Sequence, residues 1–188
     1  MAKRLGFIAE DLSDIEVLTI LAKKLTVKQF TVSHFVGKGC GPILRKTPGW
    51  CANLLQKGCS HVVVVHDLDR HNMQELKAKL DAVLVCAPQR LKAVVIPVEE
   101  LEAWLLSDVS AIAVALNLPK IPENIHHPET ISSPKEHIGK LVRKIANTRK
   151  EYVNTVHNHL IAQKIDIKKL KKKCPSFKSF SDFIANAV

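Results

Sequence analysis

The sequence predicts an α/β fold in which a mostly parallel sheet of about four strands is flanked by helices and followed by a basic helical extension. The first observation is the segment Val62–Val65, because four consecutive β-branched residues are typical of a strand buried on both faces. The second is that acidic residues lie within two positions of the ends of two short apolar segments, as side chains at the tips of parallel strands do. The third is the concentration of Lys and Arg in the C-terminal third.

The individual elements follow from the spacing of apolar residues. Strands are predicted at 5–9, 30–36, 61–65 and 91–96, and helices at 13–25, 50–56, 73–83, 97–108, 138–146, 152–165 and 177–187. Ser13 is the predicted N-cap of the first helix, with Glu16 as its capping-box partner. Residues 37–42 are predicted to be a flexible glycine-rich loop. This loop is not a phosphate-binding P-loop, because it lacks the spacing of that motif. Gly58 is the predicted C-terminal stop of the second helix.

Length and composition indicate one substantial core with a small appendage, since the chain has 188 residues and a mass of 20.9 kDa. We predict a catalytic domain at 1–115, a linker or lid at 116–134 and a basic helical extension at 135–188. No apolar run approaches the roughly 20 residues that span a bilayer, and no secretory signal is visible. Five cysteines without a C-x-x-C pair favour reduced thiols, so the protein is expected to be cytoplasmic.

The net charge of +10 is confined to the C-terminal third. Residues 134–178 contain 13 Lys or Arg and three acids, whereas the remainder contains 15 of each sign. Such asymmetry indicates a polyanionic partner, and nucleic acid, DNA rather than RNA, is the expected one. The alternative is a solvated basic helical surface.

Acidic residues mark the expected functional site. Glu10 ends the first strand, and Asp67 and Asp69 follow the third at i, i+2, a spacing that can direct both carboxylates to one point. Ligands of open α/β sheets bind at this edge, and converging carboxylates would suit Mg²⁺ or Mn²⁺. The alternative is that the two aspartates cap the next helix or shape a turn.

A further pair of acids lies beyond the fourth strand. Glu99 and Glu102 are predicted to share one face of a helix that starts at the same sheet edge. Glu99 and Glu100 would also suit an ordinary first helical turn, whereas Glu102 lies among apolar residues. Together with Glu10 and the aspartate pair, these acids form a cluster that is costly to assemble without a cation.

These residues resemble those of Toprim-type proteins, in which a glutamate ends the first strand and an Asp-x-Asp pair ends a later one. The chain is more closely similar to an uncharacterised bacterial Toprim-like family, related to the nuclease domain of overcoming-lysogenization-defect (OLD) proteins and often encoded beside an ATPase in phage-defence-type loci. The segments that carry this resemblance are Glu10–Asp14, His66–Asp69, Pro97–Leu106, Pro134–Lys135 and Cys174–Phe177. Asp11 departs from the Toprim pattern, which usually has glycine there.

The resemblance implies metal-dependent hydrolysis of nucleic acid, in phage defence or DNA repair. Asp67 and Asp69 would hold one or two divalent ions, Glu10 would ligate a second ion or accept a proton from water, and Glu102, or else Glu99, would complete the site. Further residues would contact phosphate groups: Lys38, Arg70, Lys135, Lys168, Lys169, Lys171, Lys172 and Lys173.

Two other functions remain open at this stage. The first is a non-catalytic nucleic-acid-binding or regulatory subunit that works with a partner ATPase. The second is a receiver-like domain phosphorylated on aspartate, although the basic extension and the Glu10/Glu102 pair argue against it.

Overall fold

The computed structural model describes residues 3–146 and 151–188. Its elements, in chain order, are β1 (Lys3–Ala9), α1 (Leu12–Leu25), β2 (Phe30–Val36), α2 (Cys40–Gln56), β3 (Cys59–Val65), α3 (Met73–Val85), β4 (Leu91–Val95), α4 (Glu102–Leu106), α5 (Val109–Ala115), a 3-10 turn η1 (Pro128–Thr130), α6 (Pro134–Ala146), α7 (Asn154–Lys164), α8 (Ile167–Lys173) and α9 (Phe177–Ala187). The predicted α/β fold is confirmed. Every helix among these residues is too short or too polar to cross a membrane.

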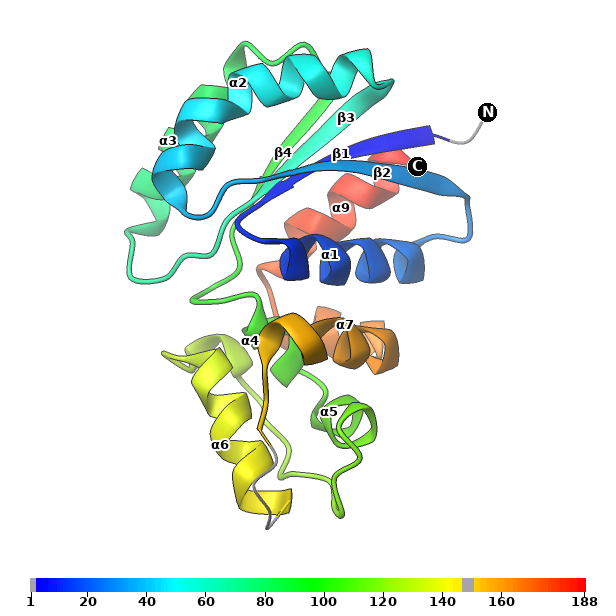
Figure 1. The fold of residues 1–188 in the computed structure, drawn as a ribbon, viewed down its shortest axis with the longest axis vertical. Coiled ribbons are helices and arrows are strands. Elements are labelled where there is room, and N and C mark those ends of the chain that lie inside the picture. Colours follow the sequence, from blue (N-terminus) through cyan, green and yellow to red (C-terminus); the bar gives the residue numbers. More distant parts are fainter. Residues whose placement is uncertain (1–2, 147–150) are drawn as a thin grey trace.

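The sheet has four strands in the order β2-β1-β3-β4, and every pairing is parallel. Helices α2 and α3 cover one face, and α1 and α9 cover the other (Figure 1). The central strands β1 and β3 are largely buried on both faces, whereas the edge strands β2 and β4 are partly exposed. Neighbouring residues of a strand point to opposite faces of the sheet. Val63 and Val65 belong to the core cluster that includes α1 and α9, whereas Val62 and Val64 belong to the cluster that includes α2 and α3.

The chain beyond β4 forms a helical layer and then returns to the sheet. Helices α4, α5, α6 and α7 lie below α1 in Figure 1, and α9 packs against β4 and α1. Phe180 of α9 contacts Phe7 of β1 edge to face, with ring centroids 6.0 Å apart. One apolar cluster therefore contains residues from both sides of the predicted boundary at residue 115.

Helix α1 begins earlier than predicted, since its N-cap is Asp11 and not Ser13. Asp11 Oδ1 accepts the backbone N–H groups of Ser13 and Asp14 at 2.7 and 3.3 Å, and the Asp14 carboxylate accepts the N–H of Asp11 at 3.1 Å. The capping box is therefore the Asp11–Asp14 pair rather than Ser13 and Glu16. An aspartate oxygen caps a helix as well as a serine oxygen does, so sequence spacing alone left the choice open.

The segment after β2 is also more regular than predicted. Helix α2 starts at Cys40, inside the predicted loop at 37–42, and tolerates Pro42 because the first turn of a helix needs no N–H from it. Gly58 follows the helix with φ +84°, as a C-terminal stop requires.

Gly37 joins the ends of β2 and β1, because its N–H donates to the Ala9 carbonyl at 2.9 Å. A Cβ atom here would lie 2.1 Å from Cγ1 of the buried Ile43. Gly37→Ala is therefore expected to lower the free energy of unfolding by about 1–3 kcal/mol, which urea denaturation would measure. Gly41→Ala is the control, since its Cβ would meet nothing within 4 Å. Equal stability of the two variants would contradict the prediction.

Candidate active site

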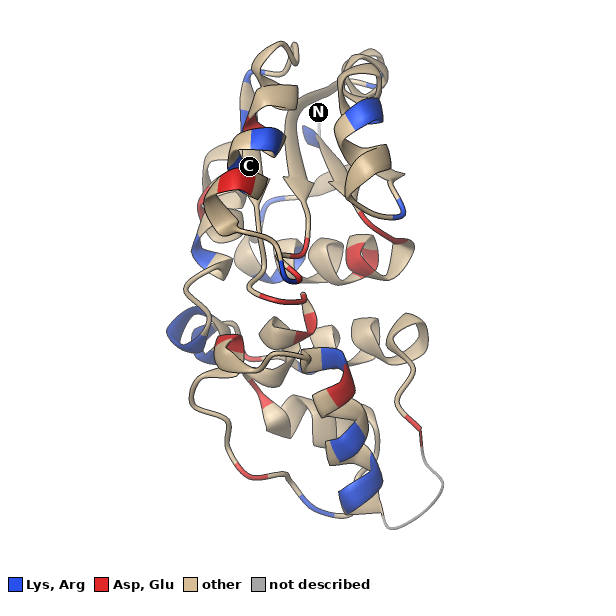
Figure 2. Ribbon diagram, turned by 90° about the vertical axis from the view of Figure 1, so that its left-hand side faces the viewer, with Lys and Arg blue, Asp and Glu red and all other residues tan. Residues whose placement is uncertain are grey.

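The candidate site lies where β1 and β3 end side by side. The chain leaves β1 toward β2 and later crosses to β3 on the opposite side, so the strand order reverses between β1 and β3. Ligands of open α/β sheets bind at such a point, beyond the carboxyl ends of the strands. The backbone N–H of Asp67 donates to Glu10 Oε1 at 3.3 Å, which brings the acids after the two strands together. Acidic residues gather at this level, between the sheet and the helices below it (Figure 2).

His66 fixes the Glu10 carboxylate from inside the protein. Its Nδ1 lies 2.6 Å from the Asp67 carbonyl oxygen and 3.1 Å from Glu10 Oε1. Because the carbonyl can only accept a hydrogen bond, Nδ1 carries a proton and donates it. The His66 side chain is buried, and its Nε2 has no hydrogen-bond partner among the described residues.

Asp67 connects the tip of β3 to the segment that leads into α4. Its Oδ1 accepts the backbone N–H of Leu101 at 2.9 Å. Asp67 does not cap the next helix, α3, because the N-cap of that helix is Asn72. Asp67 instead binds the N-terminal end of α4, which lies much later in the chain.

Asp69 and Glu99 face each other across a turn. The N–H of Asp69 donates to the Glu99 carbonyl at 2.8 Å, and both residues have left-handed backbones, with φ values of +47° and +60°. Such backbones are uncommon outside glycine and cluster at functional sites. A cleft of about 440 Å³ opens beside them, lined by Asp69, Arg70, His71, Glu99, Glu100, Ser132, Ser133 and Glu136.

Glu102 is the first residue of α4, so the predicted helix at 97–108 is wrong in its first turn. Residues 97–101 form a turn that is held by Asp67 and Asp69, and Glu99 and Glu102 therefore do not share a helical face. Glu102 is only 5% exposed, and its Oε1 accepts an N–H from the Asn158 amide at 3.0 Å. Asn158 in turn accepts the hydroxyl of Tyr152.

Asp14 is a member of the cluster that the sequence reasoning missed. Burial, and then repulsion from Asp11, Glu102 and Glu10, raises its pKa to about 7. The signal was its position in the first turn of the helix that follows Glu10, four residues further along the chain. This position did not single out Asp14, because an acidic residue there is also explained by a capping box at the start of a helix.

The other acids of the site also hold protons more tightly than usual. Burial raises the pKa of Asp67 well above its ordinary value, and repulsion from Asp14, Glu102 and Glu10 raises it further. Burial also raises the pKa values of Glu10 and Glu102. The nearby His66 opposes this effect on Glu10, and the hydrogen bond from Asn158 opposes it on Glu102. Asp69, by contrast, is exposed. The cluster thus favours a proton or a cation at its centre.

Three of the predicted phosphate-contacting residues surround these acids. The N–H of Lys38 donates to the Glu10 carbonyl at 2.8 Å, and Arg70 lines the cleft beside Asp69. Lys135 donates its backbone N–H to a Glu100 carboxylate oxygen at 2.7 Å, and its charge lowers the pKa of Glu102.

The lysines of 168–173 lie on α8 and line neither the cleft at Asp69 nor the hollow between α6 and α7 described below. Two of them bind the protein itself. Lys169 forms an ion pair with Asp108 at 2.7 Å, and Lys173 donates to the Ser107 carbonyl at 2.8 Å. Lys168, Lys171 and Lys172 are exposed.

The donor set of the cluster fits a hard divalent cation with few protein ligands. Among residues 3–146 and 151–188, no three His, Cys, Asp or Glu side chains form a closed metal-binding group. Mg²⁺ usually takes one or two carboxylates and keeps several waters, which it exchanges for substrate phosphates. The carboxylates of Asp67 and Asp69, two residues apart at the strand tip, match that requirement.

Comparison with known proteins gives the family. No curated protein and no solved structure matches the chain. Residues 13–185 match the family described as "Domain of unknown function (DUF4276)", a range that includes Asp14, Asp67 and Glu102 and begins three residues after Glu10. Because this match covers most of the sequence, the chain belongs to the DUF4276 family.

Proposed function

We propose that this protein is a Toprim-type, metal-dependent phosphodiesterase that hydrolyses nucleic acid. The observation that supports the proposal most strongly is the gathering of Glu10, Asp14, Asp67 and Glu102 around the tips of β1 and β3, with pKa values raised by burial. Buried like charges are unfavourable unless a cation or protons neutralise them, and such arrangements concentrate at functional sites.

Asp67 and Asp69 are the proposed ligands of Mg²⁺ or Mn²⁺, which would stabilise negative charge on the scissile phosphate. The Leu101 N–H holds one oxygen of the Asp67 carboxylate in place. Glu10 is the proposed acceptor of the proton from the attacking water, and its raised pKa suits that role because a general base works best near the operating pH. The Asp67 backbone N–H, which donates to Glu10 Oε1, and His66 Nδ1, which lies 3.1 Å from the same oxygen, orient the carboxylate.

Basic side chains complete the proposed site. Lys38, Arg70 and Lys135 lie around the acids and would neutralise the phosphates on either side of the bond that breaks. Glu102 is buried and accepts a hydrogen bond from Asn158, so in this proposal it does not bind the ion directly. Its negative charge, close to Asp67, instead strengthens the attraction of the site for a cation. Glu99 lies at the rim of the cleft, where it would complete the set of acids around the ion.

A second candidate function is a non-catalytic nucleic-acid-binding subunit that works with a partner ATPase, in phage defence or DNA repair. The observation that favours it is that protein groups already bind two of the acids: Leu101 binds Asp67, and Asn158 binds Glu102. Carboxylates held in this way also serve to fix a fold, without any bound metal.

A cleavage assay separates the two candidates. The protein would be incubated with supercoiled plasmid, linear DNA and structured RNA in Mg²⁺, in Mn²⁺ and in EDTA, and the products resolved on gels. Cutting that requires the metal is the expected result, and the substrate that is cut identifies the class of nucleic acid. Salt-sensitive binding without cutting would contradict the hydrolase and favour the subunit.

A further inference from the structure

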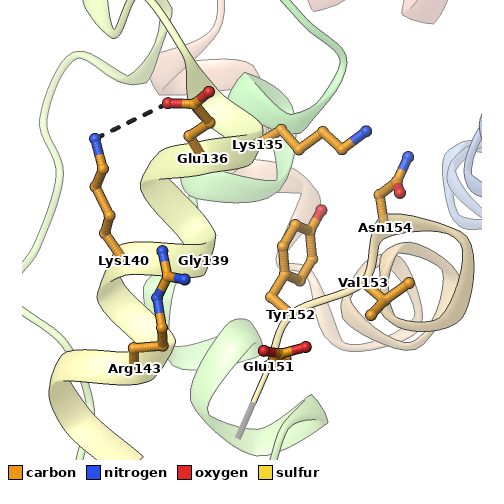
Figure 3. A pocket seen from close by; sticks show the side chains of 9 residues that line it. All are labelled: Lys135, Glu136, Gly139, Lys140, Arg143, Glu151, Tyr152, Val153 and Asn154. Atoms are coloured by element: carbon orange, nitrogen blue, oxygen red, sulfur yellow. Dashed lines mark ion pairs between the residues drawn. The ribbon is translucent and has the colours of Figure 1, made fainter. Parts of the chain in front are cut away.

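A hollow of about 500 Å³ lies between α6 and the start of α7, beside the acid cluster. It is lined by Lys135, Glu136, Gly139, Lys140, Arg143, Glu151, Tyr152, Val153 and Asn154 (Figure 3). Its size lies within the range of roughly 300–1,000 Å³ that is typical of ligand pockets. It shares Glu136 with the cleft at Asp69 and Glu99, so the two cavities adjoin.

The hollow combines positive charge with an aromatic ring. Lys135, Lys140 and Arg143 outnumber its two acids, and Lys140 lies 3.9 Å from Glu136, which partly neutralises that carboxylate. The Tyr152 ring lies between α6 and α7, and the Lys135 side chain extends across the space above its hydroxyl (Figure 3). Cationic side chains next to an aromatic surface are the combination that binds the phosphate and the base of an unpaired nucleotide.

A chain of hydrogen bonds joins the hollow to the acids. The Tyr152 hydroxyl donates to Asn158 Oδ1, and the Asn158 amide donates to Glu102 Oε1 at 3.0 Å. Asn158 is 1% exposed, so this connection is shielded from water. The position of the tyrosine ring is thus fixed relative to Glu102.

We propose that this hollow binds one unpaired nucleotide of single-stranded nucleic acid, with its base against Tyr152 and its phosphate beside Lys135 and Arg143. In a closed duplex both faces of each base are covered by its neighbours, so only an unpaired nucleotide can stack on a protein ring. The inference rests on the proposed function, because it places the neighbouring phosphodiester at the acid cluster. It makes a single strand, an end or a loop the substrate of that site.

The test measures binding without metal, so that it does not depend on cleavage. Fluorescence anisotropy in EDTA would follow labelled single strands of about 12 nucleotides, of DNA and of RNA, and a duplex of the same sequence. The native protein is expected to bind a single strand at least about fivefold more tightly than the duplex. Tyr152→Leu is expected to weaken single-strand binding by at least about fivefold, the low end of the effect of losing one stacked base.

Further variants separate the ring and the charges from the fold. Tyr152→Phe keeps the ring, which also packs against the apolar core, and should bind within about twofold of the native protein because stacking needs no hydroxyl. Arg143→Gln should weaken binding and reduce its salt dependence, whereas Glu136→Gln should strengthen binding. Lys164→Gln is the control for charge, because Lys164 ends α7 and does not line the hollow.

The outcomes distinguish this inference from the proposed function. Equal binding of single strand and duplex, or equal losses in Arg143→Gln and Lys164→Gln, would overturn the nucleotide site even if cleavage is observed. Selective single-strand binding that depends on Tyr152 and Arg143 would support the site even if no metal supports cleavage.

Discussion

Asp67→Asn is expected to lower metal-dependent cleavage of nucleic acid by at least about 100-fold while the protein remains folded. Mutation of a residue that hydrogen-bonds to a metal ligand typically lowers metal affinity or activity 10–100-fold. Loss of the charge of the ligand itself is expected to lower activity further. The asparagine oxygen can still accept the Leu101 N–H, whereas alanine would leave that group without its acceptor. Removing one of several repelling charges should also leave the free energy of unfolding equal or higher.

The measurement compares initial cleavage rates of Asp67→Asn and the native protein, purified in parallel. Asp81→Asn is the matched control, because Asp81 is an exposed residue of α3 whose ion pair with Lys77 lies outside the cluster. It should cleave at the native rate. Native-like cleavage by Asp67→Asn would show that the acids at the strand tips are not the active site.

Thermal stability in EDTA is expected to decrease as the pH rises from about 4 to about 7. The pKa of Asp14 is about 7 in the folded protein and near 3.8 when the chain is unfolded. Between these values the folded state holds a proton that the unfolded state has released, so the free energy of unfolding falls with rising pH. A shift of this size corresponds to on the order of 4 kcal/mol, and the raised pKa values of Asp67, Glu10 and Glu102 act in the same direction.

Two comparisons test the origin of this pH dependence. Asp14→Asn should melt at a higher temperature than the native protein at pH 8 and show a flatter profile, whereas Asp81→Asn should follow the native profile. Mn²⁺ should raise the melting temperature more at pH 8 than at pH 5, because a bound cation replaces the protons that the acids otherwise hold. If the melting temperatures of Asp14→Asn and the native protein change with pH in the same way, repulsion between the acids does not cause the pH dependence of stability.

The strands and their tips were predictable because the relevant signals are local. The valines of β3 specify a strand buried on both faces, and β2 was placed correctly at Phe30–Val36. Parallel strands end at one edge, so the proximity of Glu10 and Asp67 followed from fold class alone. Composition indicated the basic C-terminal third that includes Lys135, but not that Lys135 bonds to Glu100 next to the acids.

The parts that were missed depend on contacts between distant segments. Residues 97–101 look helical by composition, yet hydrogen bonds to Asp67 and Asp69 hold them in a turn. The link from Tyr152 through Asn158 to Glu102 joins residues about 50 positions apart, and no local pattern indicates it. The lysines of α8 looked like one surface, although Lys169 and Lys173 are used to hold the helical layer together.

The return of α9 to the sheet has a consequence for synthesis on the ribosome. All four strands are present once residue 95 has been made, but the side of β1 and β4 that packs against α9 stays uncovered until residues 177–187 emerge. The nascent sheet therefore carries an open apolar face for the time it takes to translate about 80 further residues, which favours transient association with chaperones. Completion of the core depends on a contact between residues far apart in sequence, so the sheet cannot finish folding before residues 177–187 are available.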